Sequence, residues 1–195
     1  MSKSKMVGLI AVGFLCVVLI VSSSFIWGAG FRGSGNSGNY LTETQLNNLN
    51  VIDPGIYVSN NTSTVYINSS SSLPVMMGPM NSVSMYSFEI LSLINPQIIV
   101  RNGTEIHFTV VNIDDDSYHN FVMGTYAPPY PHGIGGGMMF NGQYSSMMQY
   151  LPPVNSGHYA YANFSYDFTS GGTFWYLCTY PGHAQNGMYG KIIVT

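Results

Sequence analysis

From Val51 to the C-terminus, short apolar segments alternate with polar residues and are separated by turn-forming residues. Segments such as GIYVSN, TSTVYINSS and EIHFTVVNI place apolar side chains at about every second position, which is the period of a β-strand with one buried face. Later segments continue the pattern, with Gly, Pro, Asn and Asp between them: QIIVRNG, HYAYANFSYDF, GGTFWYLCTY and MYGKIIVT. Strands of this length and spacing predict an all-β sandwich or barrel.

The N-terminal segment differs, because residues 6–30 carry no charge. The run MVGLIAVGFLCVVLIVSSSFIW is about long enough to cross a bilayer as one helix, and Trp27 closes it as an interfacial aromatic residue does. A cleaved signal peptide is the alternative, with a shorter apolar core and a small-residue cleavage site. We favour a cytoplasmic tip and retained transmembrane anchor over residues 1–31. Lys3 and Lys5 keep the N-terminus cytoplasmic, so the remaining chain lies outside.

The anchor is followed by a polar segment and then by the β-rich part. Residues 32–50 are rich in Gly, Ser and Asn and predict a flexible linker. Residues 51–195 form the predicted β domain. Within it, the stretch 126–153 is rich in Gly, Met, Tyr and Pro, and a loop of this length is usually functional or mobile.

Charge is scarce in the 195 residues. Charged residues make up 7% of the chain and apolar residues 46%, so a core is available while the surface is built from Ser, Asn, Thr, Gly and Tyr. The net charge is −3, and only Arg101 and Lys191 are basic beyond residue 32. No basic patch is available for phosphates, which excludes a nucleic-acid partner.

The low number of carboxylates leads to a hypothesis about the surroundings. A fold that uses few ion-paired carboxylates loses little stability when they are protonated, so we expect this domain to face an acidic medium. A mildly polar exported protein is the alternative. A series of thermal melts from pH 7 to about pH 2 separates the two, because loss of the fold by about pH 4, where carboxylates titrate, contradicts an acid-adapted domain.

The segment CTYPGHAQNGMYGKIIV carries the strongest chemical signal. Cys178, His183 and Met188 follow a C-x4-H-x4-M spacing. Thiolate, imidazole and thioether are the ligands that copper takes in mononuclear sites. FWYLC predicts a strand that ends at Cys178, Pro181-Gly182 predicts a turn, and the chain returns as a strand after Met188. One hairpin loop therefore presents three ligands.

A trigonal copper site needs a second histidine, and His119 is the best candidate because it stands at the end of a strand-like stretch. His107, His132 and His158 are better explained as structural or exposed residues. Zinc is disfavoured, since methionine is a poor zinc ligand. A cysteine hydrolase is also disfavoured, because Met188 has no role in it. Cys16 lies in the apolar run, so we expect no disulfide with Cys178.

The segment resembles the C-terminal loop of mononuclear blue copper proteins, and more narrowly that of rusticyanin and the archaeal sulfocyanins. The matching residues are Cys178, Pro181, Gly182, His183, Ala184, Gly187, Met188, Gly190, Lys191, Ile192 and Val194. The anchor, the linker and the His-Asn dipeptide favour sulfocyanin; rusticyanins have serine where this chain has Asn120. The resemblance implies a Greek-key cupredoxin sandwich, with Asn120 orienting the ligands and the edge of His183 reaching an apolar surface.

Together these features predict one copper ion (Cu2+/Cu+) bound by His119, Cys178, His183 and Met188. The predicted function is single-electron transfer on the outer face of the membrane in a respiratory chain, with a cytochrome or terminal oxidase as redox partner. The domain is expected to be monomeric and to be no enzyme, because no coordination position is left for a substrate. The alternative is a copper-binding protein for delivery or storage that uses a Met-rich surface, formed by the Met-rich insert at 126–153 together with Met76, Met77, Met80 and Met85.

Overall fold

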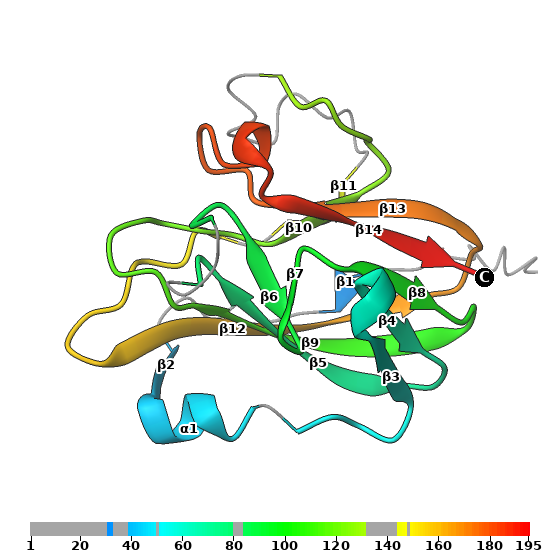
Figure 1. Cartoon of the computed structure of the whole chain (residues 1–195), viewed down its shortest axis with the longest axis horizontal. Coiled ribbons are helices and arrows are strands. Elements are labelled where there is room, and N and C mark those ends of the chain that lie inside the picture. The colour runs from blue at the N-terminus through cyan, green and yellow to red at the C-terminus, as the bar shows by residue number, and fades with distance from the viewer. Residues whose placement is uncertain (1–30, 33–38, 50, 80–83, 132–143, 148) are drawn as a thin grey trace, which may run out of the picture.

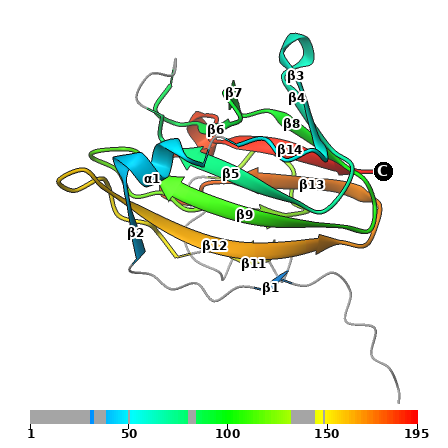
Figure 2. The ribbon, with the colours of Figure 1, turned by 90° about the horizontal axis from the view of Figure 1, so that it is seen from below.

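A computed structural model describes residues 31–32, 39–49, 51–79, 84–131, 144–147 and 149–195. In this part of the chain two sheets of seven strands each lie face to face, as Figures 1 and 2 show from two directions. The predicted all-β sandwich is confirmed. The predicted membrane anchor, residues 1–31, lies outside the described residues except at Phe31. Within the described residues, no helix is long and apolar enough to span a membrane.

The first sheet has the order β1-β12-β9-β5-β6-β7, and β2 also pairs with β12. Its strands are β1 (Phe31–Arg32), β2 (Asn39–Thr42), β5 (Ser71–Met77), β6 (Phe88–Ile90), β7 (Leu93–Ile94), β9 (Thr104–Asn112) and β12 (His158–Phe168). The long central pairs are β12 with β9, which is antiparallel, and β5 with β9, which is parallel.

The second sheet has the order β11-β10-β13-β14-β8-β4-β3. Its strands are β3 (Ile56–Ser59), β4 (Thr64–Ile67), β8 (Gln97–Val100), β10 (Val122–Gly124), β11 (Tyr144–Met147), β13 (Gly172–Leu177) and β14 (Tyr189–Val194). One α-helix and two 3-10 helices join the strands: α1 (Glu43–Asn47), η1 (Asn60–Thr62) and η2 (Ala184–Asn186).

Alternation along the strands produces the core between the sheets. In β12 and β14 every second residue is buried, as the sequence pattern predicts. Rings fill the centre: Phe121 lies 5.4 Å from Tyr176 and stacks on it, and Phe108 stacks on Phe164 at 4.9 Å between ring centroids. The Tyr176 hydroxyl donates to the carbonyl of Pro96 at 2.7 Å, so this buried polar atom is satisfied.

Two stretches differ from the sequence-based prediction. Part of the range 32–50, predicted to be a flexible linker, forms β2 and α1, and β2 adds to the edge of β12 through Asn39–Thr42. Thr42 caps α1 through a capping box with Gln45, a signal that is visible in the sequence TETQ. Part of the predicted loop 126–153 forms β11, which pairs with β10. Alternation was too short in both stretches to reveal these strands.

Candidate metal centre

His119 is fully buried and lies in the connection between β9 and β10. Its backbone N–H donates to the carbonyl of Leu151 at 3.2 Å, and its carbonyl accepts from the N–H of Leu151 at 2.7 Å. This bridge ties the histidine to the segment that leads into β12. His119 therefore sits just before β10, the strand that pairs with β13.

The hairpin between β13 and β14 carries the other three predicted ligands. Cys178 directly follows β13, and the chain turns through Gly182, whose φ of 86° is one that glycine adopts readily. Two backbone hydrogen bonds close the loop: the N–H of Cys178 donates to the carbonyl of Met188 at 3.1 Å, and the N–H of Met188 donates to the carbonyl of His183 at 3.0 Å. The loop thus holds Cys178, His183 and Met188 together, as the spacing predicts.

Three donor atoms converge between these segments. The Sγ of Cys178 lies 3.8 Å from Nδ1 of His119 and 3.5 Å from Nδ1 of His183, and the two Nδ1 atoms are 3.1 Å apart. All three side chains are buried. Met188 is fully buried as well. Two imidazoles and one thiolate around a common centre, with a thioether in the same loop, fit a copper ion and not a hard oxygen-seeking cation.

Asn120 joins the histidine segment to the cysteine loop. Its side-chain oxygen accepts the N–H of Thr179 at 2.8 Å, and its side-chain nitrogen donates to Oγ1 of Thr179 at 2.8 Å. Its backbone N–H points to the Sγ of Cys178 at 3.5 Å. These contacts hold Cys178 at a fixed distance from the His119 segment, the orienting role that the resemblance implied.

The surroundings of His183 differ from the expectation. The resemblance implied a ring edge at the surface, yet His183 is only 4% exposed. Tyr86 approaches its ring edge-on with centroids 5.1 Å apart, and Tyr180 lies at 4.8 Å. Tyr118, 45% exposed, stacks on Tyr180. Tyrosine rings therefore stand between much of this ligand and the solvent.

In the metal-free protein the three titratable ligands are uncharged at physiological pH. Burial raises the pKa of the Cys178 thiol to about 11, because a thiolate is poorly solvated there. Burial, followed by the nearby His119, lowers the pKa of His183 to about 4. Burial also lowers the pKa of His119, although the Asp114 carboxylate opposes this. At pH 7 the Cys178 thiol is therefore protonated. Both imidazoles are already neutral, so neither has to lose a proton before it binds copper.

Copper(II) binding at pH 7 is therefore expected to release about one proton per ion, from Cys178. The release is measured with a pH indicator in weakly buffered solution. Because the free thiol titrates near 11, copper affinity is expected to rise about tenfold per pH unit above pH 7. Met188→Leu is the control and should release the same single proton, since methionine carries none. Release of two protons, or of none, contradicts these protonation states.

Two further histidines of the described residues, His107 and His158, are not part of this donor cluster. The exposed ring of His107 contacts Oγ of Ser165 on β12 at 2.6 Å. His158 is exposed at the start of β12. His132 lies outside the described residues. The prediction that His107 and His158 are structural or exposed is consistent with these positions.

Sequence reasoning missed several residues that position the site. Asp114 contacts His119, Asn112 holds the loop around it, and Tyr150 donates to the carbonyl of Thr179 at 3.1 Å. Gly78, directly after β5, lies against His119. The local sequence does not distinguish these residues from their neighbours. Asp114 is one of three consecutive aspartates at 114–116, and Tyr150 is one of 15 tyrosines.

Comparison with known proteins agrees with this geometry. The family model for copper binding proteins of the plastocyanin/azurin family matches residues 83–195. This chain belongs to that family. The matched range contains all four predicted ligands, so the centre is the type 1 copper site of a plastocyanin/azurin-family protein, and its cofactor is one copper ion.

The individual proteins that this chain resembles are also copper proteins. Rusticyanin from Acidithiobacillus ferridurans is 31% identical over 115 residues, which cover 55% of this chain and 54% of the relative. The copper-resistant cuproprotein CopI from Rubrivivax gelatinosus is 32% identical over 99 residues, 50% of this chain and 56% of the relative. The chain thus spans about half the length of these relatives. The structure of rusticyanin from Thiobacillus ferrooxidans superimposes with a TM-score of 0.69 at 25% identity and covers 80% of this chain and 96% of that one.

The comparisons confirm the cupredoxin fold and the predicted relationship to rusticyanin. Plastocyanin/azurin-family proteins of the rusticyanin type are electron-transfer proteins and not enzymes, which agrees with the prediction from the closed ligand set.

Proposed function

We propose that this protein carries single electrons through its type 1 copper site on the outer face of a membrane, in a respiratory chain. The observation that carries the proposal is the closed donor set. His119, Cys178 and Met188 are fully buried and His183 is 4% exposed. With four protein ligands and no open face, a substrate has no position to bind, whereas an electron needs none.

The chain contributes a rigid and dry ligand set. When bound, copper supplies a one-electron couple between Cu2+ and Cu+. Asn120 and Thr179 lock the two ligand segments together, and the two backbone bonds of Met188 fix the loop. Ligands that are held in one arrangement move little when the charge at the centre changes, which is the property an electron carrier needs.

The location and the partners belong to the proposal as well. The uncharged run 6–30 supports a single-pass anchor with a cytoplasmic N-terminus, and this run lies outside the described residues. The anchor and the His119-Asn120 dipeptide support a closer relation to the sulfocyanins. A cytochrome or terminal oxidase is the proposed redox partner, and the domain is proposed to act as a monomer.

Copper delivery is the second candidate function. It relies on a Met-rich surface, but Met77 is fully buried in the core between the sheets. Met85 is 40% exposed and Met76 is partly buried, while Met80 lies outside the described residues. The buried Cys178 thiol also suits retention of copper better than hand-over. These observations favour the carrier.

The test is the visible spectrum of the copper-loaded soluble part of the chain. A carrier is expected to be intensely blue when oxidised, from thiolate-to-copper charge transfer, and to bleach and recover over repeated cycles with a one-electron reductant and oxidant. Apoprotein reconstituted with zinc is the control and should be colourless throughout. Weak colour together with rapid loss of copper(I) to a chelator favours delivery instead.

A further inference from the structure

Asp114 is a buried carboxylate outside the predicted ligand set. Its side chain is 5% exposed, and its Oδ2 lies 2.9 Å from Nε2 of His119. Its other oxygen, Oδ1, accepts the backbone N–H groups of Asp116 at 2.9 Å and Ser117 at 3.2 Å. Both oxygens are thus engaged as acceptors, which is the condition under which a carboxylate is tolerated in a protein interior.

The loop around Asp114 is held in one conformation. The side-chain oxygen of Asn112 accepts the N–H of Asp114 at 3.1 Å. The side-chain nitrogen of the fully buried Asn112 donates to three carbonyls, those of Ser117, Leu151 and Pro152, at 2.9 to 3.0 Å. Because Leu151 also bridges to His119, one network fixes both partners of the His119–Asp114 contact.

Close packing prevents the pair from moving apart toward β5. A Cβ placed on Gly78 would lie 2.6 Å from Oδ2 of Asp114 and 2.7 Å from Nε2 of His119. The glycine backbone therefore closes this side of the contact, and among the described residues the hydrogen-bond partner of Nε2 is Oδ2 of Asp114.

The proton on His119 follows from these contacts. An ionised carboxylate only accepts hydrogen bonds, so Nε2 must carry the proton. Two backbone N–H groups donate to Oδ1 of Asp114, and hydrogen bonds of this kind stabilise a carboxylate in its ionised form. With the proton on Nε2, the neutral ring presents a free lone pair on Nδ1, the atom that faces Cys178 and His183.

We propose that Asp114 is a positioning residue that selects the Nε2–H tautomer of His119, makes Nδ1 the copper ligand, and favours the copper(II) state through its negative charge. The part on the tautomer rests on His119 being a ligand. The part on the copper(II) state rests also on the proposed electron-carrier function.

Asparagine cannot replace this carboxylate, although it has the same shape. Its side chain offers one acceptor and one donor, whereas the site needs two acceptors. If the amide nitrogen faces His119, the ring must move its proton to Nδ1, where the copper lone pair is required. If the amide nitrogen faces the backbone N–H groups of Asp116 and Ser117, donors face a donor and both hydrogen bonds are lost.

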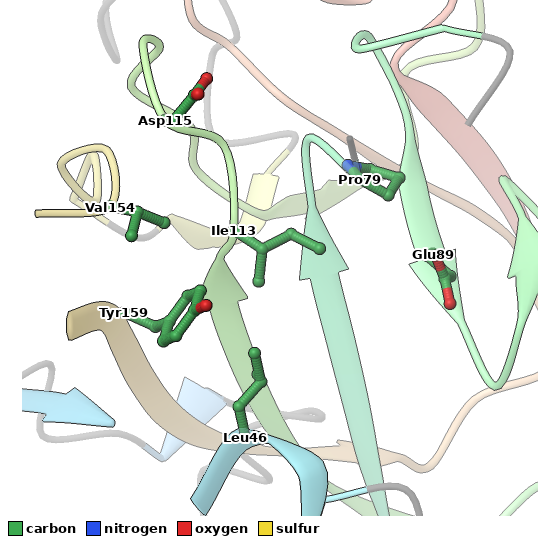
Figure 3. A pocket seen from close by; sticks show the side chains of 7 residues that line it. All are labelled: Leu46, Pro79, Glu89, Ile113, Asp115, Val154 and Tyr159. Atoms are coloured by element: carbon green, nitrogen blue, oxygen red, sulfur yellow. The ribbon is translucent and has the colours of Figure 1, made fainter. Parts of the chain in front are cut away.

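Asp115 provides a matched control. It is the next residue, it has the same charge, and it is exposed. Asp115 lines an open pocket of about 240 Å³ together with Ile113 and Tyr159. Its carboxylate points away from these two side chains (Figure 3). Asp115→Asn therefore removes the same charge from the same loop without touching His119.

The first experiment uses metal-free protein and does not depend on electron transfer. Long-range ¹H–¹⁵N correlation spectra at about pH 8 identify which ring nitrogen of each histidine is protonated. In the wild-type protein and in Asp115→Asn, His119 is expected to be protonated at Nε2; in Asp114→Asn, a substantial Nδ1–H population is expected. A wild-type His119 protonated at Nδ1 overturns the proposal, and this result holds even if Asp114→Asn fails to fold.

The second experiment compares copper-loaded proteins. Asp114→Asn is expected to bind copper(II) about 10- to 100-fold more weakly, the usual effect of losing a partner of a metal-bound histidine, and to have a higher reduction potential. Asp115→Asn should match the wild type in affinity and shift the potential less. Wild-type affinity and potential in Asp114→Asn overturn the positioning role. A colourless protein with the expected tautomers refutes the electron-carrier function alone.

Discussion

Replacing Cys178 by serine is expected to abolish the intense visible absorption of the copper(II) protein. The band arises from charge transfer out of the thiolate, and Cys178 is the only cysteine in the described residues. Serine keeps the shape of the side chain, but its hydroxyl is a hard ligand that stays protonated near neutral pH. The measurement is the absorption spectrum after addition of one equivalent of copper(II).

Met188→Leu is the matched control for this loss of colour. Leucine removes the thioether while leaving Cys178, His119 and His183 in place, so the protein should stay strongly coloured and change its reduction potential. A far-ultraviolet circular dichroism spectrum confirms that both variants keep the sandwich. Intense blue colour in Cys178→Ser would rule out the thiolate as the copper ligand.

Gly78→Ala is expected to destabilise the metal-free protein by about 2–5 kcal/mol. Gly78 has a φ of +68°, which costs an alanine about 1–2 kcal/mol. The added methyl group would also lie 2.6–2.7 Å from Asp114 and His119, and overpacking at a buried site typically costs about 1–3 kcal/mol. Urea unfolding monitored by circular dichroism gives the free energy, and copper titration should show weaker binding because His119 is displaced.

Gly157→Ala separates the two contributions. Gly157 has nearly the same φ, +73°, but nothing lies within 4 Å of the position of its Cβ. This variant should lose only the backbone contribution of about 1–2 kcal/mol and bind copper like the wild type. Equal losses of stability and of copper affinity in both variants would show that the contact of Gly78 with the metal site is unimportant.

The sequence predicts the metal centre better than the framework that holds it. Cys178, His183 and Met188 are close in sequence, and the turn at Pro181-Gly182 fixes their geometry locally. His119 comes from the connection between β9 and β10, so its placement depended on the sandwich and on the family resemblance. The copper ligands therefore could be named before the structure was known.

The residues that position His119 could not be named in advance, because they act across the fold. Asp114 differs from Asp115 and Asp116 only in the direction in which the loop points it. Gly78 is distinguished only by its close approach to Asp114 and His119, which are distant from it in sequence. The covering of His183 by Tyr86 and Tyr180 likewise joins segments about 95 residues apart. Such contacts depend on tertiary packing, which no local pattern encodes.

The pairing of β2 with β12 has a consequence for how far the copper domain could travel from a membrane. A flexible chain over all of residues 32–50 would have a root-mean-square span of about 24 Å. Because β1 (Phe31–Arg32) and β2 (Asn39–Thr42) both pair with β12, the sheet already begins where the proposed anchor ends, and the free span between anchor and sheet is far shorter than this value. The copper domain would then be held close to the membrane surface and would diffuse in two dimensions. It would meet partners whose docking face lies close to the lipid surface.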